Sequence, residues 1–241
     1  MAANGVNNIA TTTSGTNAGG SVENDPLVLI PELSRLFYKN GWVTGTAGGI
    51  SMRYQNQIYI TPSSVQKERI KSTDLFIYND NEEITYSPPL LKPSQCSPLF
   101  FLSHRFRNAG CCIHTHSQNA VLITLKYDKE FIVIDQEMIK GIIKGYDQPP
   151  QYYKNFEKLV IPIIDNHPEE LDLKQPLYEA MEKYPETNAI LVRRHGLFVW
   201  GPNWAKTKTM TECFDYLFEI SLKMLALGID PSIPVSNNSN K

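Results

Sequence analysis

The sequence has little that would place the protein in a membrane or on nucleic acid. No segment approaches the roughly 18 consecutive apolar residues of a membrane-spanning helix. The 241 residues include 23 Lys and Arg against 25 Asp and Glu, so the basic surface typical of nucleic-acid binding is missing. The first residues lack a charged start followed by an apolar core, and we therefore expect no secretory signal.

Cysteine is also scarce. Only four are present, and two of them, Cys111 and Cys112, are adjacent. Neighbouring residues of a strand point to opposite faces, so these two thiols are not expected to pair. The sequence therefore indicates no disulfide framework, and a reducing cytoplasm is the expected compartment.

Composition divides the chain into one ordered domain and two tails. Residues 1–24 are rich in Thr, Gly, Asn, Ser and Ala, so this tail is predicted to be disordered. Residues 231–241 are predicted to form a flexible C-terminal tail. Residues 25–230 mix strand and helix patterns, with hairpin-like strands early, which predicts an α/β domain whose sheet is not purely parallel. Pro31 suits the first turn of the first helix.

The most informative stretch, residues 109–116, is an apolar strand that ends in two histidines. Because side chains alternate along a strand, His114 and His116 project to the same side and could hold one metal ion. Residues 190–195 repeat the pattern and run into His195. Sites in open α/β sheets form outside the carboxyl ends of strands. These three imidazoles could therefore leave a fourth position open, as in catalytic zinc sites.

A His-x-His pair is also found as two polar residues at a strand end, so the motif alone leaves both interpretations open. His195 at a matching strand end favours the metal site. The other two histidines lack such a setting, because His104 lies in a predicted helix and His167 in a loop before Pro168. Both are interpreted as surface or packing residues.

Two loops rich in glycine and hydroxyl residues could receive an anion. In residues 41–51, Gly48 and Gly49 precede a strand, and glycine lets backbone N–H groups approach an anion closely. The loop matches neither the P-loop nor the dinucleotide fingerprint. Ser63 follows another strand and has Lys67 nearby, which would suit a phosphate. Plain loop connections explain both segments as well.

Two further residues are candidates for chemistry. Ser97 and Pro98 open a predicted helix, which puts Cys96 beside a helix N-terminus, where the dipole would lower the pKa of its thiol. A small buried residue is the alternative reading of Cys96. Glu137 follows the apolar strand of residues 131–134 and is a candidate general base, the alternative being a solvated glutamate at a helix start.

Several of these segments together resemble the class II aldolase/adducin family over about residues 26–228. The segments that carry the resemblance are Gly45 to Ser51, Pro62-Ser63-Ser64, His114-Thr115-His116 and His195-Gly196. Within the family, residues 62–70, 94–96, 113–117, 136–141 and 192–196 are most similar to a branch of dehydratases that act on a keto-sugar phosphate. The resemblance implies a three-layer α/β/α sandwich with a central, mainly antiparallel sheet.

The resemblance also implies a set of site residues. The zinc ligands of the family fall on His114, His116 and His195. The proton donor and acceptor falls on Glu137, and a substrate contact falls on Cys96. The residues expected near the phosphate are Ser63, Gly48 and Gly49. A homotetramer with active sites near subunit interfaces and a small sugar phosphate as substrate are further implications.

Departures from the family pattern narrow the choice of reaction. Ser94-Gln95-Cys96 has no carboxylate where the sugar-phosphate aldolases carry a glutamate, which speaks against retro-aldol chemistry. Adducin-like members lose the histidines that this sequence keeps. Ala47 replaces a glycine that is usual in the dehydratase branch, which is tolerable if the residue needs no positive φ. An aldolase or epimerase of the same fold, a zinc hydrolase and a non-catalytic interaction module remain as alternatives.

Overall fold

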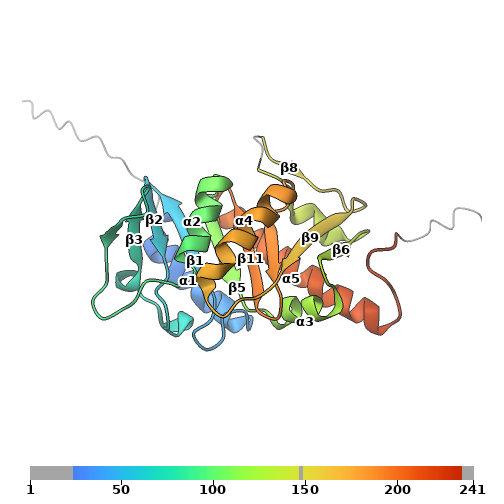
Figure 1. The fold of residues 1–241 in the computed structure, drawn as a ribbon, viewed down its shortest axis with the longest axis horizontal. Helices are drawn as coiled ribbons and strands as arrows, with labels where there is room; N and C mark the ends of the chain where they lie inside the picture. The colour runs from blue at the N-terminus through green and yellow to red at the C-terminus, as the bar shows by residue number, and fades with distance from the viewer. Residues whose placement is uncertain (1–23, 147–148, 235–241) are drawn as a thin grey trace, which may run out of the picture.

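The computed structural model describes residues 24–146 and 149–234. Within them, a nine-stranded sheet carries helices on both faces (Figure 1). Of the tails predicted at residues 1–24 and 231–241, residues 1–23 and 235–241 lie outside the described residues. Among the described residues, no helix combines the length and apolar character needed to cross a bilayer.

The large sheet is almost entirely antiparallel. Its strands follow one another in space as β4 (Ile84–Tyr86), β3 (Phe76–Asn79), β2 (Gln57–Ile60), β1 (Gly49–Tyr54), β5 (Cys111–Thr115), β11 (Gly196–Gly201), β10 (Ala189–Val192), β9 (Leu159–Ile164) and β6 (Glu130–Val133). Only β9 and β10 run parallel to each other. A separate hairpin joins β7 (Ile143–Lys144) to β8 (Gln151–Tyr152).

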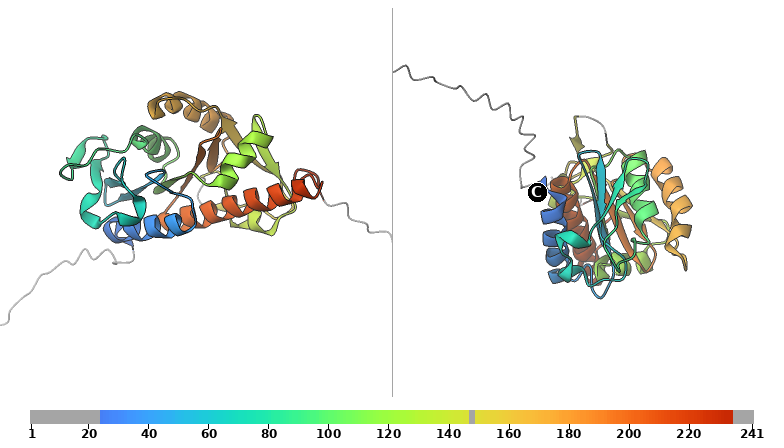
Figure 2. Two further views of the ribbon diagram at one scale, coloured as in Figure 1. Left: turned by 90° about the horizontal axis from the view of Figure 1, so that it is seen from below. Right: turned by 90° about the vertical axis from the view of Figure 1, so that its left-hand side faces the viewer.

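Helices form the two outer layers, which Figure 2 shows from two further sides. One face of the sheet carries α1 (Pro26–Lys39), α3 (Gln118–Lys126) and α5 (Trp204–Ala226). The other carries α2 (Ser97–Phe106) and α4 (Lys174–Lys183). Short 3₁₀ turns are η2 (Lys67–Arg69), η3 (Ser72–Asp74), η4 (Glu137–Gly141) and η5 (Glu170–Leu173). The predicted α/β/α sandwich with a mainly antiparallel sheet is confirmed.

The alternation of side chains along β5 determines on which face of the sheet the side chain of His114 lies. Cys111 and Ile113 pack with α1, whereas Cys112 packs with α2 and α4. His114, two residues after Cys112, lies on the α2 and α4 side, as the period of a strand requires. Its ring stacks on Phe198 of the neighbouring β11, with 3.9 Å between the ring centroids. The predicted buried strand is therefore confirmed.

The first helix begins earlier than Pro31 predicts. Asp25 accepts a hydrogen bond from the backbone N–H of Leu27 at 2.9 Å, and Pro26 occupies the first turn. Pro31 lies inside the helix, and placing it in the first turn was wrong. The sequence offers a proline at both positions, and the capping carboxylate of Asp25 selects the earlier one.

His104 is a packing residue, as predicted. It is buried on α2, where its Nε2 lies 2.8 Å from Ser51 Oγ and its Nδ1 lies 2.8 Å from Ala109 O. Burial lowers the pKa of His104 to about 4. The folded state therefore holds this imidazole neutral over a range in which an unfolded histidine, with a pKa near 6.5, takes up a proton.

Because the pKa of His104 is lower in the folded state than in the unfolded state, the stability of the protein should depend on pH. The contribution of His104 is complete above about pH 6.5 and is lost as the pH falls toward 4, because only the unfolded state binds the proton. Between pH 7 and 5, the free energy of unfolding of His104→Gln should fall about 1–2 kcal/mol less than that of the wild type in urea titrations. The exposed His167→Gln serves as control, and equal losses in the wild type and His104→Gln would contradict the assignment.

Candidate metal site and the adjoining cavity

Three histidines meet where β5 and β10 end. His116 follows β5 directly, and His195 lies in the turn between β10 and β11. The Nε2 atom of His116 lies 3.0 Å from Nε2 of His114 and 3.1 Å from Nε2 of His195. The structure thus brings together the three residues that the sequence proposed as metal ligands.

The second nitrogen of two of these rings is held by an acceptor. Nδ1 of His114 lies 3.1 Å from Leu197 O, and Nδ1 of His195 lies 3.0 Å from Asn166 Oδ1. Because a backbone carbonyl oxygen can only accept, Nδ1 of His114 carries the hydrogen and its Nε2 presents a lone pair. Partners of this kind commonly orient histidines that bind metals.

The surroundings keep the imidazoles neutral. Burial and the neighbouring histidines lower the pKa of His114, and burial together with His195 lowers the pKa of His116 to about 4. Neutral imidazole is the form that binds a metal. Lone pairs that face one another at about 3 Å need a proton or a cation between them, so this donor set fits a divalent ion such as zinc.

Gly196 allows the two histidine-bearing segments to lie so close. A β-carbon at this position would lie 2.0 Å from Thr115 O and 3.2 Å from the α-carbon of His116. No side chain can be accommodated against a backbone atom at such a distance. The His-Gly pair that ends the strand in the sequence therefore has a packing reason as well as a chemical one.

A cavity of about 160 Å³ adjoins the histidines. Besides the end of β5 with His114 and His116, four segments build its wall, namely the glycine loop before β1, the loop after β2, the residues just before α2 and the start of η5. Residues of the wall include Thr46, Gly48, Ser63, Lys67, Cys96 and Glu170. The structure therefore places Ser63, Gly48 and Cys96 beside the histidines.

The glycines of the loop serve the backbone. Gly48 has a φ of +69°, and a β-carbon there would lie 2.7 Å from His114 O. Gly49 pairs with His114 inside the sheet and is not part of the cavity wall. A β-carbon on Gly49 would lie 2.9 Å from Thr61 Oγ1. Ala47 is not among the residues with positive φ, so the alanine at this position is tolerated as expected.

Lys67 is a buried cation in the cavity wall, with an exposed fraction of 2%. Its Nζ donates to Thr46 O at 2.8 Å and to Val65 O at 3.3 Å, so it joins the glycine loop to the loop after β2. Burial lowers the pKa of Lys67 to about 8, so the amine is mainly charged at neutral pH. The sequence marked this residue only as a nearby cation.

Cys96 is the N-cap residue of α2, but the prediction that its thiol has a lowered pKa was wrong. Burial, followed by the carboxylate of Glu170, raises the pKa of Cys96. Desolvation penalises the thiolate more than the helix dipole stabilises it. The protonated thiol donates to Glu170 Oε2 across 3.7 Å.

Glu170 is a carboxylate of the cavity that sequence reasoning missed. Its Oε1 lies 3.3 Å from Nε2 of His195, and its side chain is 20% exposed. In the sequence it is one of two adjacent glutamates after His167-Pro168, without a motif that could have singled it out. It places a carboxylate next to Cys96, so the absence of one at position 96 itself no longer separates a dehydratase from an aldolase.

Glu137 and the histidines of its own chain lie beyond opposite ends of the strands of the large sheet. The last residue of β6 pairs with the first residue of β9, whereas the last residue of β10 pairs with the last residue of β9. The ends of β6 and β10 are therefore separated by the length of β9, about 17 Å. The side chain of Glu137 is 71% exposed and forms an ion pair with Lys140.

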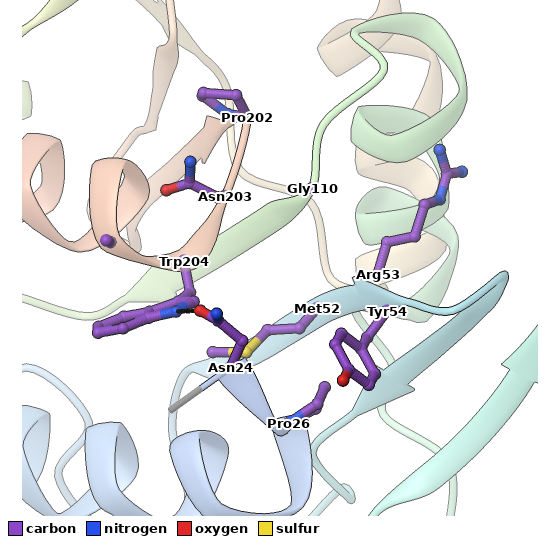
Figure 3. A pocket seen from close by; sticks show the side chains of 10 residues that line it. Asn24, Pro26, Met52, Arg53, Tyr54, Gly110, Pro202, Asn203 and Trp204 are labelled. Carbon is purple, nitrogen blue, oxygen red and sulfur yellow. Dashed lines mark hydrogen bonds between the residues drawn. The ribbon is translucent and has the colours of Figure 1, made fainter. Parts of the chain in front are cut away.

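A larger cavity of about 500 Å³ lies at the opposite end of β5 (Figure 3). Met52, Arg53 and Trp204 contribute to its wall, and Trp204 Nε1 donates to Asn24 Oδ1 at 2.9 Å. None of the described residues that line it is His, Cys, Asp or Glu. Chemistry rather than size therefore marks the histidine cavity as the candidate site.

The chain belongs to the class II aldolase/adducin family. The family model described as "Class II Aldolase and Adducin N-terminal domain" matches residues 28–222. Solved structures share the fold at low sequence identity. An L-fuculose 1-phosphate aldolase superposes with a TM-score of 0.69 at 16% identity over 90% of this chain and 92% of its own. The L-fuculose-1-phosphate aldolase from Thermus thermophilus gives 0.62 at 20% identity over 83% of this chain and 94% of its own.

Relatives of much higher identity carry a more specific name. A protein of Dictyostelium discoideum named probable methylthioribulose-1-phosphate dehydratase is 57% identical over 88% of this chain and 94% of its own length. The methylthioribulose-1-phosphate dehydratase of Xenopus tropicalis is 54% identical over 86% of this chain and 87% of its own. Both matches span nearly the whole domain that the structure describes.

Metal binding can be tested without a substrate. A ligand that binds only the folded state at a hundred times its dissociation constant stabilises it by about 2.7 kcal/mol. Adding Zn²⁺ to the metal-free protein should therefore raise its Tm, and His116→Ala should abolish the increase. The exposed His167→Ala should retain it, and an unchanged wild-type Tm in the presence of Zn²⁺ would contradict the site.

Proposed function

We propose that the protein is a zinc-dependent dehydratase of methionine salvage. It converts 5-methylthioribulose 1-phosphate to 2,3-diketo-5-methylthiopentyl 1-phosphate and water. The observation that carries this proposal is the meeting of three imidazoles, in which Nε2 of His116 lies about 3 Å from Nε2 of each of the other two, beside a cavity with a buried cation. The names of the highly identical relatives support the choice of substrate.

The phosphate of the substrate is proposed to lie against the glycine loop and the loop after β2. Lys67 joins these loops by donating to a carbonyl group of each, and it supplies a positive charge to the cavity wall. Ser63 and Ser64 place two hydroxyl groups 3.3 Å apart in the same wall, and both can donate to phosphate oxygens. Gly48 lets the loop lie against the strand that carries His114.

The reaction removes the hydrogen from C3 and the hydroxyl group from C4 of the keto-sugar. The metal held by His114, His116 and His195 would act as a Lewis acid on the carbonyl group at C2, which acidifies the hydrogen on C3. Glu137 accepts this proton and returns it to the departing hydroxyl group, which leaves as water. The resulting enol between C3 and C4 rearranges to the 2,3-diketone.

Glu137 can serve this reaction only in an assembly of copies. It lies beyond the opposite end of the strands from the histidines of its own chain, and its side chain is largely exposed there. The cavity of about 160 Å³ is also smaller than the roughly 300 Å³ at the lower end of typical ligand pockets. A neighbouring subunit of the proposed homotetramer would supply both the carboxylate and the missing part of the wall.

The proposed reaction can be measured directly. Purified protein loaded with Zn²⁺ should form the diketone from 5-methylthioribulose 1-phosphate, and a chelator should lower kcat about a hundredfold or more, since metal catalysis contributes several kcal/mol. Fuculose 1-phosphate and ribulose 5-phosphate serve as comparison substrates. Cleavage or epimerisation of either, without diketone formation, would identify an aldolase or epimerase instead.

The assignment of Glu137 to a neighbouring subunit predicts complementation. His116→Ala and Glu137→Gln should each be inactive alone. Mixed assemblies should regain about a quarter of wild-type activity, because one site in four then combines an intact histidine set with an intact Glu137. Each variant mixed with itself is the control. Mixed assemblies that stay inactive, with an inactive Glu137→Gln, would place the glutamate and the histidines of a site in one chain.

A further inference from the structure

A third cavity, of about 60 Å³, lies at the opposite ends of β10 and β11 from His195. Three of the residues that line it are almost fully buried, namely Arg107 at the end of α2, Asn188 just before β10 and Trp200 near the end of β11. Their exposed fractions are 3%, 2% and 1%. Among the described residues, none lines both this cavity and the histidine cavity, so the two are separate features of the domain.

Each of these three side chains has a buried polar atom without a hydrogen-bond partner among the described residues. The atoms are Nε of Arg107, Oδ1 of Asn188 and Nε1 of Trp200. Buried polar atoms of proteins are nearly always hydrogen-bonded, because an unpaired atom loses its bonds to water without replacement. Three such atoms in the wall of one cavity therefore point to an occupant that pairs with all of them.

Arg107 brings a positive charge that the described residues do not neutralise. Its Nη2 donates to Met181 O and, at 3.2 Å, to Tyr184 O, and its guanidinium carbon lies 4.8 Å from the centre of the Tyr146 ring. These partners are neutral, and within the described part of the chain no carboxylate forms an ion pair with Arg107. Buried charges in proteins are paired as a rule, so the expected occupant is an anion.

The amide of Asn188 adds a further requirement. Its Nδ2 donates to Ile143 O at 3.2 Å and to Gly145 O at 2.8 Å, which fixes Oδ1 as an acceptor. Arg107 Nε and Trp200 Nε1 can only donate. The occupant must therefore accept two hydrogen bonds and donate one. It must also be small, since the cavity is only a few times the roughly 10–15 Å³ that one water molecule needs.

We propose that this cavity binds a small oxyanion that carries a hydroxyl group. Its anionic oxygens accept from Arg107 Nε and Trp200 Nε1, and its hydroxyl group donates to Asn188 Oδ1. Hydrogen phosphate, hydrogencarbonate and a short hydroxycarboxylate such as glycolate share this chemistry. The site needs neither the metal nor the proposed reaction. Residues 143–146 of its wall follow η4, the turn that carries Glu137, so the bound oxyanion would join this segment to the ends of α2 and β11.

NMR spectra of protein labelled with ¹⁵N-tryptophan test the site directly. The chain has three tryptophans, so three indole N–H signals are expected, and Trp200→Phe identifies one of them by its loss. Separate titrations with phosphate, hydrogencarbonate and glycolate should move the Trp200 signal to saturation with at least one of them, because its indole gains an acceptor. Sodium chloride at matched ionic strength should leave the signal in place. If none of the three anions moves it, the cavity holds only water and the proposal is wrong.

Three variants show whether the anion binds at Arg107. Arg107→Gln should weaken binding at least about tenfold, because it removes a charge-assisted hydrogen bond. Arg105→Gln is the matched control, since it removes the same charge from an exposed residue of α2 that pairs with Glu82, and it should bind as the wild type does. Lys67→Met removes the cation of the histidine cavity and should leave the Trp200 titration unchanged.

Thermal unfolding checks that each of these variants is folded. Equal affinity of Arg107→Gln and the wild type would overturn the assignment. Loss of the Trp200 titration in a folded Lys67→Met would also overturn it, because the anion would then bind at the histidine cavity. None of these measurements uses substrate or metal, so their outcome is separate from that of the proposed reaction.

Discussion

The contact between the end of β5 and the start of β11 is the constraint on which the candidate site depends. Antiparallel pairing of these strands sets His114 against Phe198, and Gly196 lets the turn that carries His195 lie against the backbone of Thr115. A larger residue at position 196 would separate the two segments and with them the imidazoles. The fold thus brings together three nitrogens from distant parts of the chain through backbone packing.

Electrostatics then decides what this arrangement can bind. Burial and mutual proximity make protonation of His114 and His116 unfavourable, so a metal cation has no proton to displace there at neutral pH. Lys67 lies in the same cavity wall, where two carbonyl groups of the loops hold its amine, and its charge adds to the lowering of the pKa of His114 and His116. One cavity therefore offers a region for a cation and a region for an anion.

The sequence predicted those features of the fold and of the candidate site that depend on a local residue pattern. The buried strand, the two histidines on one side of it and the third at a similar strand end follow from periodicity, and the layers follow from the family resemblance. Lys67 and Glu170 could not be assigned, because each acts through contacts with segments distant in the sequence. The rule that sites gather at the carboxyl ends of strands misplaced Glu137, because it holds for parallel strands and β6 runs antiparallel to β9.

The separation of Glu137 from the histidines has a consequence for how the protein works at different concentrations. Under the proposed assignment, every reaction centre is divided between two molecules, and a lone molecule has only halves of two centres. Catalytic output then follows the equilibrium between free and associated molecules, by the law of mass action. Dilution should then lower the activity per subunit without unfolding the protein, because dissociated subunits lack complete active sites.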